Sequence, residues 1–134
     1  MLKGKLLNSN IMAAISKMGH TDRIAIADAG LPIPEGVERI DIALTRNMPT
    51  FRDTAAAVAE VMEIEKVILA EEIKTNNKGT LEWIMRKFAD VQVEFVVHED
   101  FKALTAGTKA VVRTGECTPY ANIILQSGVD FSGE

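Results

Sequence analysis

The sequence of 134 residues carries 47% hydrophobic side chains, which suits one globular domain, residues 1–134, with a substantial core. Its 15 basic and 19 acidic side chains give a formal net charge of -4 and form no long run of one sign, which argues against nucleic acid or an anionic membrane surface as a partner. The single cysteine excludes an intrachain disulfide, and charged residues interrupt every long apolar stretch, so no transmembrane span is predicted.

The N-terminal part of the chain reads as a helix followed by a buried strand. Apolar residues recur at helical spacing over residues 10–18, behind a polar Asn8-Ser9-Asn10 cluster that can cap the first turn. This N-terminal segment turns polar before any signal-peptide core develops, so we expect a cytoplasmic protein. An isoleucine-rich run that ends at Ala27 predicts the strand, and the carboxylate of Asp28 follows it directly.

Two prolines exclude regular structure over residues 30–36. Alternation over 37–44 then predicts a second strand, and a start resembling a capping box at Thr50-Phe51-Arg52-Asp53 predicts a helix that reaches about residue 62. The rest of the chain repeats this alternation. Further strands are expected over 67–70, 91–97, 110–113 and from residue 123, and further helices over 80–89 and 99–105. The pattern predicts an α/β fold, three-layered, with a mostly parallel sheet of about six strands and helices on both faces.

Polar side chains stand where several predicted strands end. Asp28 follows the first strand, Glu71-Glu72 the third, His98 the fourth and Arg113 the fifth. The carboxyl ends of parallel strands share one edge of the sheet, where α/β proteins bind ligands. The alternative role for each residue is a solvated loop charge or a helix cap, and it weighs most for Glu71, Glu72 and Arg113.

The segment Thr118 to Asn122 precedes the last predicted strand. If that strand runs antiparallel to its neighbour, its beginning reaches the edge that carries Asp28 and His98, and Tyr120 and Asn122 face a ligand together because alternate residues share a side. Phenol, carboxamide, carboxylate and imidazole groups suit a neutral polyol. The alternative is a simple turn at a strand edge, in which Pro119 ends the pairing.

His20 stands apart from this cluster along the chain, because an extended chain from His20 to Asp28 covers up to roughly 26 Å. Either the turn at Gly19-His20-Thr21-Asp22 folds back, or His20 joins a site whose other groups come from a neighbouring subunit. We favour the second hypothesis. A third reading makes His20 a C-terminal helix cap.

Other chemistries have weaker support. Two histidines and a carboxylate lack the tight spacing of a metal site, so no metal is expected. Cys117 is expected to be a small buried thiol rather than a nucleophile, and Trp83 to be a packing residue. The nucleotide, hydrolase and disulfide-exchange motifs GxGxxG, GxSxG and CxxC are absent from the sequence.

The chain resembles the D-ribose pyranase family, within the wider group of sugar mutarotases that includes L-fucose mutarotase. The resemblance runs from end to end, and the loop at residues 30–34 and the histidine after the fourth strand favour the ribose branch. The segments that carry it are Leu7-Asn8-Ser9, Gly19-His20-Thr21-Asp22, Asp28-Ala29-Gly30-Leu31-Pro32-Ile33-Pro34, Ile40-Asp41, Ala70-Glu71-Glu72-Ile73-Lys74, His98-Glu99 and Gly115-Glu116-Cys117-Thr118-Pro119-Tyr120-Ala121-Asn122-Ile123-Ile124-Leu125.

This resemblance implies an isomerase that interconverts pyranose and furanose ribose without a cofactor. It places His20 as the proton donor, and it places the sugar-binding groups at Asp28, His98, Tyr120, Ala121 and Asn122. It also implies a homo-oligomer, a ring-like decamer with the site at a subunit interface. One departure is Asn47, where the family has glycine; asparagine tolerates positive φ, so the turn is expected to survive.

Ring interconversion passes through the open-chain aldehyde and needs a proton moved to the ring oxygen and another taken from the anomeric hydroxyl. We assign the first step to His20, since an imidazole changes protonation near neutral pH; the base stays open among the other groups and a bound water. Two alternatives remain: an L-fucose-type mutarotase, and a non-catalytic cytoplasmic ribose-binding protein.

Overall fold

The computed structural model describes residues 1–133 and places six strands in one mixed sheet. The strands are β1 (Arg23–Ala27), β2 (Glu38–Asp41), β3 (Ile64–Ala70), β4 (Gln92–Val96), β5 (Ala110–Arg113) and β6 (Ile123–Ser127). Their order across the sheet is β2-β5-β1-β6-β3-β4. Five strands point the same way, and β6 lies between β1 and β3, antiparallel to both. The mostly parallel α/β sheet is confirmed.

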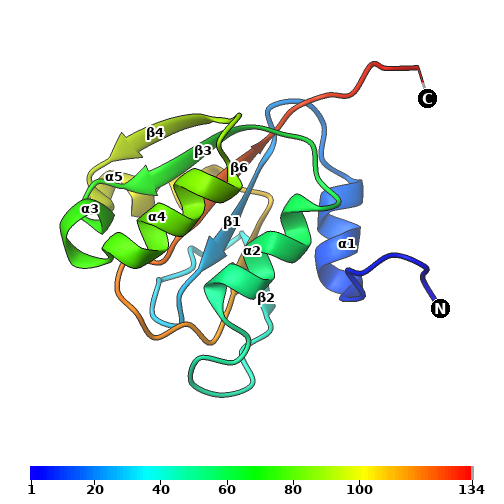
Figure 1. The fold of residues 1–134 in the computed structure, drawn as a ribbon. Helices are drawn as coiled ribbons and strands as arrows, with labels where there is room; N and C mark the ends of the chain where they lie inside the picture. The colour runs from blue at the N-terminus through cyan, green and yellow to red at the C-terminus, as the bar shows by residue number, and fades with distance from the viewer. Residues whose placement is uncertain (134) are drawn as a thin grey trace.

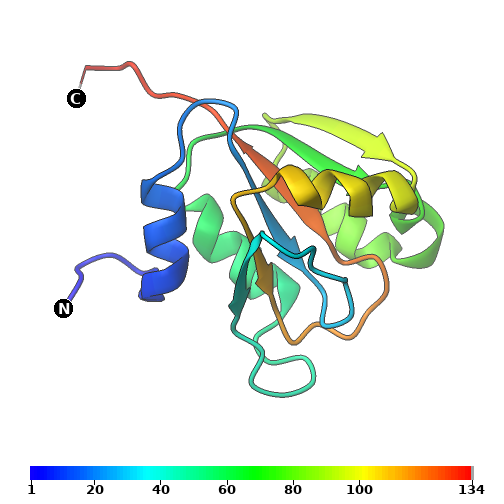
Figure 2. The ribbon, with the colours of Figure 1, turned by 180° about the vertical axis from the view of Figure 1, so that it is seen from behind.

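Helices cover both faces of this sheet. They are α1 (Ser9–Ser16), α2 (Phe51–Ala59), α3 (Ile73–Asn76), α4 (Lys78–Lys87) and α5 (His98–Leu104), followed by a 3-10 turn at Thr105–Gly107. Figure 1 shows α1, α2 and α4 in front of the sheet, and Figure 2 shows α5 on the opposite face. Three layers therefore form, with the larger helical layer on one side. None of the helices among residues 1–133 has the length and apolar character to span a membrane.

The alternation of side chains along β1 builds a separate core on each face. Ile24 and Ile26 belong to the larger core, which includes Phe51 of α2, whereas Ala25 packs in the smaller core with Phe101 of α5. Successive strand residues point to opposite faces, so a five-residue apolar run can serve both layers. Burial on both sides explains why the run reads as continuously apolar.

Element boundaries differ modestly from the predicted ones. The predicted strand over 37–44 ends at Asp41, because the chain then turns and Leu44 N–H donates to the carbonyl of Met48 at 2.9 Å. The predicted helix to residue 62 ends at Ala59. The short helix α3 was not predicted, since four residues are too few to show a helical period.

The turn that contains Asn47 is confirmed. Asn47 has φ of 60°, the left-handed conformation that asparagine tolerates, and its N–H donates to the Gly115 carbonyl at 2.6 Å. Gly115 lies so close to this turn that an added Cβ would be 2.3 Å from the carbonyl oxygen of Thr45. The turn and the chain after β5 therefore pack backbone against backbone.

Candidate functional site

The antiparallel direction of β6 brings Asn122 to the carboxyl end of β1. Its side-chain Oδ1 accepts a hydrogen bond from the backbone N–H of Asp28 at 2.8 Å, and its Nδ2 donates to the Asp28 carboxylate at 3.1 Å. Asn122 is fully buried. Both ends of the amide are used, so the pair can exist in only one orientation and Asp28 is held firmly. The predicted meeting of these two residues is confirmed.

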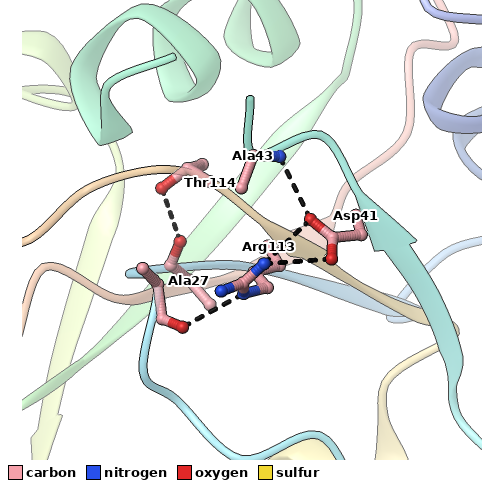
Figure 3. A network of polar contacts seen from close by, with 6 residues as sticks. Ala27, Asp41, Ala43, Arg113 and Thr114 are labelled. Carbon is pink, nitrogen blue, oxygen red and sulfur yellow. Dashed lines mark hydrogen bonds and ion pairs between the residues drawn. The ribbon is translucent and has the colours of Figure 1, made fainter. Parts of the chain in front are cut away.

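The loop after β1 is supported from several sides. The N–H of Gly30 donates to the Asp28 carboxylate at 2.9 Å, and the N–H of Ala29 donates to the carbonyl of Glu116 at 2.8 Å. Arg113 Nε donates to the Ala29 carbonyl at 3.1 Å, while its Nη1 pairs with Asp41 at 3.0 Å (Figure 3). Arg113 therefore acts as a support for the loop that carries Asp28.

Burial raises the pKa of the Asp28 carboxyl above its ordinary value. The hydrogen bonds from Gly30, Asn122 and Leu31 and the nearby His98 imidazole oppose this effect without cancelling it. The result is a carboxylate that binds a proton more readily than an exposed aspartate does. Such a group suits proton exchange with a sugar hydroxyl.

His98 and Tyr120 stand beside Asp28. His98 is the first residue of α5, and its ring meets the Tyr120 ring edge-on, with centroids 5.0 Å apart and planes at 89°. The Phe101 ring lies nearly parallel to the same imidazole, with ring centroids 6.4 Å apart. The rings of His98 and Tyr120, both predicted for the site, are thus brought together by the start of α5 and the segment before β6.

The reason given for the placement of Tyr120 was wrong. Tyr120 and Asn122 both precede β6 and Tyr120 has φ of 57°, so the alternation of a strand does not place the two on one face. Asn77 instead holds this turn, because its Nδ2 donates to the carbonyl of Pro119 at 2.8 Å and to the hydroxyl of Thr118 at 3.0 Å. Ala121 is fully buried, with its side chain in the larger core, and it is not among the residues that line the pocket.

Asp28, His98 and Tyr120 line an open pocket of about 320 Å³ at the sheet edge. A monosaccharide fits a hollow of this size, which lies at the low end of the range for small-molecule sites. A carboxylate, an imidazole and a phenol are the polar side chains of its lining. The lining residues are Asp28, Gly30, Leu31, Pro32, His98, Pro119 and Tyr120.

His20 does not reach this pocket within one chain. It lies before β1 and Asp28 lies after it, and the five residues of the strand span roughly 16 Å. The His20 Nε2 instead contacts the Glu65 carboxylate at 3.0 Å, and both side chains are exposed. The turn at residues 19–22 therefore does not fold back, and it presents the imidazole on the surface at the opposite edge of the sheet.

The prediction that Cys117 is buried was wrong. Its thiol is exposed, and its Sγ lies 3.3 Å from the carbonyl of Gly115. Cys117 falls in the irregular connection between β5 and β6, where no layer covers the chain. Trp83 does pack as predicted, edge-on against Phe51 with ring centroids at 6.3 Å. Among residues 1–133, no three His, Cys, Asp or Glu side chains cluster as a metal site would require.

Sequence reasoning missed the residues that support the site. Glu72 was considered only as a pocket group or loop charge, yet its carboxylate accepts from the backbone N–H of His98 at 3.0 Å and 3.1 Å. Asn77 was not singled out at all. Its position just before a helix signals an N-cap, which the 3.4 Å contact with the N–H of Thr80 bears out, but nothing in the sequence indicates its bond to Pro119.

Comparison with known proteins identifies the family of this chain. The RbsD / FucU transport protein family model matches residues 1–130. A protein of Bacillus subtilis (strain 168) named D-ribose pyranase is 51% identical over 131 residues, 98% of this chain and 100% of the relative. A protein of Clostridium novyi (strain NT) with the same name is 52% identical over 131 residues, again 98% of this chain and 100% of the relative.

Solved structures show the same fold. Bacillus subtilis RbsD complexed with D-ribose aligns with a TM-score of 0.95 at 51% identity, covering 98% of this chain and 100% of that one. The fucose mutarotase of Streptococcus pneumoniae aligns with a TM-score of 0.74 at 21% identity, over 92% of this chain and 94% of that one. Since the family model spans almost the whole sequence and relatives are half identical over nearly their full length, the chain belongs to the RbsD/FucU family.

Proposed function

We propose that this protein interconverts the pyranose and furanose forms of D-ribose by acid/base-assisted opening and closure of the sugar ring. The observation that carries the proposal is the pairing of Asp28 with Asn122 beside the His98 and Tyr120 rings, in an open pocket of monosaccharide size. The names of the relatives and the ribose complex of the RbsD neighbour support the choice of sugar. The protein is proposed to act in the cytoplasm.

In this reaction, the anomeric hydroxyl loses its proton as the bond from the anomeric carbon to the ring oxygen breaks. The ring oxygen gains a proton, and the open-chain aldehyde results. Closure through a different hydroxyl reverses these transfers and gives the other ring size. No net oxidation or reduction occurs, so two positioned proton-transfer groups suffice. Asp28, His98 and Tyr120 are proposed to hold the hydroxyls, and the buried Ala121 and Asn122 to support them from behind, Asn122 through its two hydrogen bonds to Asp28.

His20 is proposed as the acid that protonates the ring oxygen, acting in the pocket of a neighbouring subunit. Its exposure on the edge opposite to Asp28 supports this arrangement, because an exposed side chain can enter a second copy. The Glu65 carboxylate at 3.0 Å orients the imidazole. The assembly would be a closed homo-oligomer, for which the family resemblance suggests a decamer, so each interface would build one complete site.

Subunit complementation tests this arrangement. We would mix and reassemble a His20→Ala variant, which lacks the acid, with an Asn122→Ala variant, which lacks the anchor of Asp28, and follow ribose exchange by saturation-transfer NMR. Neither variant alone should accelerate exchange. When the two variants mix at random in equal amounts, roughly a quarter of the sites should be restored. Only those sites pair the intact pocket of a His20→Ala subunit with the intact His20 of an Asn122→Ala subunit. Mixtures that stay inactive would count against a site shared between subunits.

The same measurement separates the alternatives. Acceleration of L-fucose anomer exchange over that of ribose would favour the fucose-type mutarotase. Ribose binding without any acceleration of exchange would favour a non-catalytic ribose-binding protein. Full activity of the His20→Ala variant would remove the role of His20 as acid.

A further inference from the structure

The main chain of His98 is anchored by a carboxylate from the neighbouring strand. Glu72 follows β3, which pairs with β4, and both its carboxylate oxygens accept from the His98 backbone N–H at 3.0 Å and 3.1 Å. The N–H of Glu71 also donates to the carbonyl of Val96 at 2.6 Å, so the ends of the two strands are joined twice. This anchor determines where α5 begins and where the imidazole leaves the backbone.

The His98 ring is held between aromatic neighbours in a way that leaves one nitrogen without a partner. Tyr120 meets the ring edge-on and Phe101 lies nearly parallel to it. Nδ1 is buried and has no hydrogen-bond partner among residues 1–133. His98 lines the pocket, and its Nε2 is not among the buried atoms without a partner, so we take Nε2 as the nitrogen that faces the open space.

The unpartnered Nδ1 decides which nitrogen carries the proton. A neutral imidazole has one N–H donor and one acceptor nitrogen. Buried N–H groups without an acceptor are rarer in proteins than acceptors that lack a donor, so the proton belongs on Nε2. There it points into the pocket and is available to an oxygen of the sugar.

We propose that Glu72 is a positioning residue of the sugar site, which holds His98 so that its Nε2–H donates to an oxygen of the bound sugar. This inference rests on the proposed function, since it gives His98 a defined task in the ribose site. Glu72 touches no reacting atom and acts only through the backbone of His98. The donor from His98 complements the carboxylate of Asp28, which is an acceptor in the same pocket.

The test compares Glu72→Ala with Glu71→Ala as a matched control. Glu71 is the adjacent residue and its carboxylate pairs with Lys74 at 2.7 Å. Thermal unfolding and size-exclusion chromatography would first establish that each variant keeps the wild-type assembly. For Glu72→Ala we expect KM for ribose to rise about tenfold, equivalent to the loss of one hydrogen bond, with a smaller change in kcat. Glu72→Gln should restore most of the affinity, because its amide oxygen still accepts from the His98 N–H.

Nitrogen-15 NMR of the imidazoles gives a readout that a merely structural role would not change. The wild-type spectrum should show the His98 proton on Nε2, and addition of ribose should shift that signal. Glu72→Ala should give a mixture of tautomers, whereas Glu71→Ala should match the wild type. A proton on Nδ1 in the wild type, or a Glu72→Ala variant with unchanged KM and unchanged imidazole signals, would overturn the inference. These ribose-induced shifts require binding alone, so a wild type that binds ribose without accelerating exchange would refute the proposed activity and leave this inference standing.

Discussion

His20 and Asp28 lie at opposite ends of the same strand, β1, and their side chains serve opposite edges of the sheet. If His20 is the acid and Asp28 holds the sugar, as proposed above, the two groups can meet only between chains. The arrangement makes any activity that needs both residues depend on assembly. Dilution below the dissociation constant of the oligomer would then remove activity while leaving the fold of each subunit.

The paired hydrogen bonds between Asp28 and Asn122 should contribute to stability as well as to the site. Asn122→Ala removes both bonds and leaves the partly buried backbone N–H of Asp28 without this acceptor. We expect the free energy of unfolding to fall by about 2 kcal/mol, measured by urea denaturation, together with loss of ribose binding. Asn10→Ala, at an exposed position of α1, is the control and should leave both quantities unchanged. Equal stability of the two variants would contradict the pairing.

The raised pKa of Asp28 predicts a particular dependence of stability on pH. Between the unfolded value near 3.8 and the higher folded value, the folded state binds the proton and the unfolded state does not. The free energy of unfolding should therefore decrease as pH rises through this range. Above the folded pKa, the whole free-energy cost of burying the charged carboxylate is present. The Asp28→Asn variant should lack this pH dependence. The check is the difference between the two proteins in unfolding free energy, measured from about pH 3 to pH 8; a constant difference would contradict a raised pKa.

The ends of strands were predictable because a buried strand stops where the polarity of the sequence changes. Asp28 and His98 follow apolar runs and stand at the predicted edge. The sequence could not predict the direction of β6, since an apolar run such as Ile123 to Leu125 looks the same in a parallel and an antiparallel strand, so the meeting of Asn122 and Asp28 was predicted only for an antiparallel β6. The condition holds in the structure, and it brings Asn122 to Asp28.

The supporting contacts were out of reach of sequence reasoning for a physical reason. Glu72 and His98 are 26 positions apart and Asn77 and Pro119 are 42 apart, and each contact depends on which strands are neighbours. The exposure of Cys117 depends likewise on what covers the connection after β5. Local patterns give the elements, whereas contacts between their ends follow from the order of strands in the sheet.

Asn77 offers a way to separate helix capping from support of the site. Asn77→Asp keeps an oxygen that accepts from the N–H of Thr80, but it removes the Nδ2 donor to the Pro119 carbonyl. We expect the melting temperature to change little and KM for ribose to rise severalfold, because Tyr120 loses the support of its left-handed conformation. Asn77→Ala, which loses both functions, should lower the melting temperature as well. A wild-type KM in Asn77→Asp, with both effects confined to Asn77→Ala, would show that capping alone matters.

Gly115 should be intolerant of any side chain, because the turn at Thr45 to Met48 packs directly on its backbone. A Cβ there would be 2.3 Å from the Thr45 carbonyl oxygen and 2.7 Å from the backbone nitrogen of Met48, so backbone atoms would have to move. We expect Gly115→Ala to reduce the free energy of unfolding by about 2 kcal/mol. Gly107→Ala is the matched control, since an added Cβ meets nothing within 4 Å there. Displacement of the turn should also disturb the hydrogen bond from Ala29 to Glu116, so ribose affinity should fall in Gly115→Ala and not in Gly107→Ala. Retention of wild-type stability and affinity by Gly115→Ala would show that this turn can shift without reaching the loop that carries Asp28.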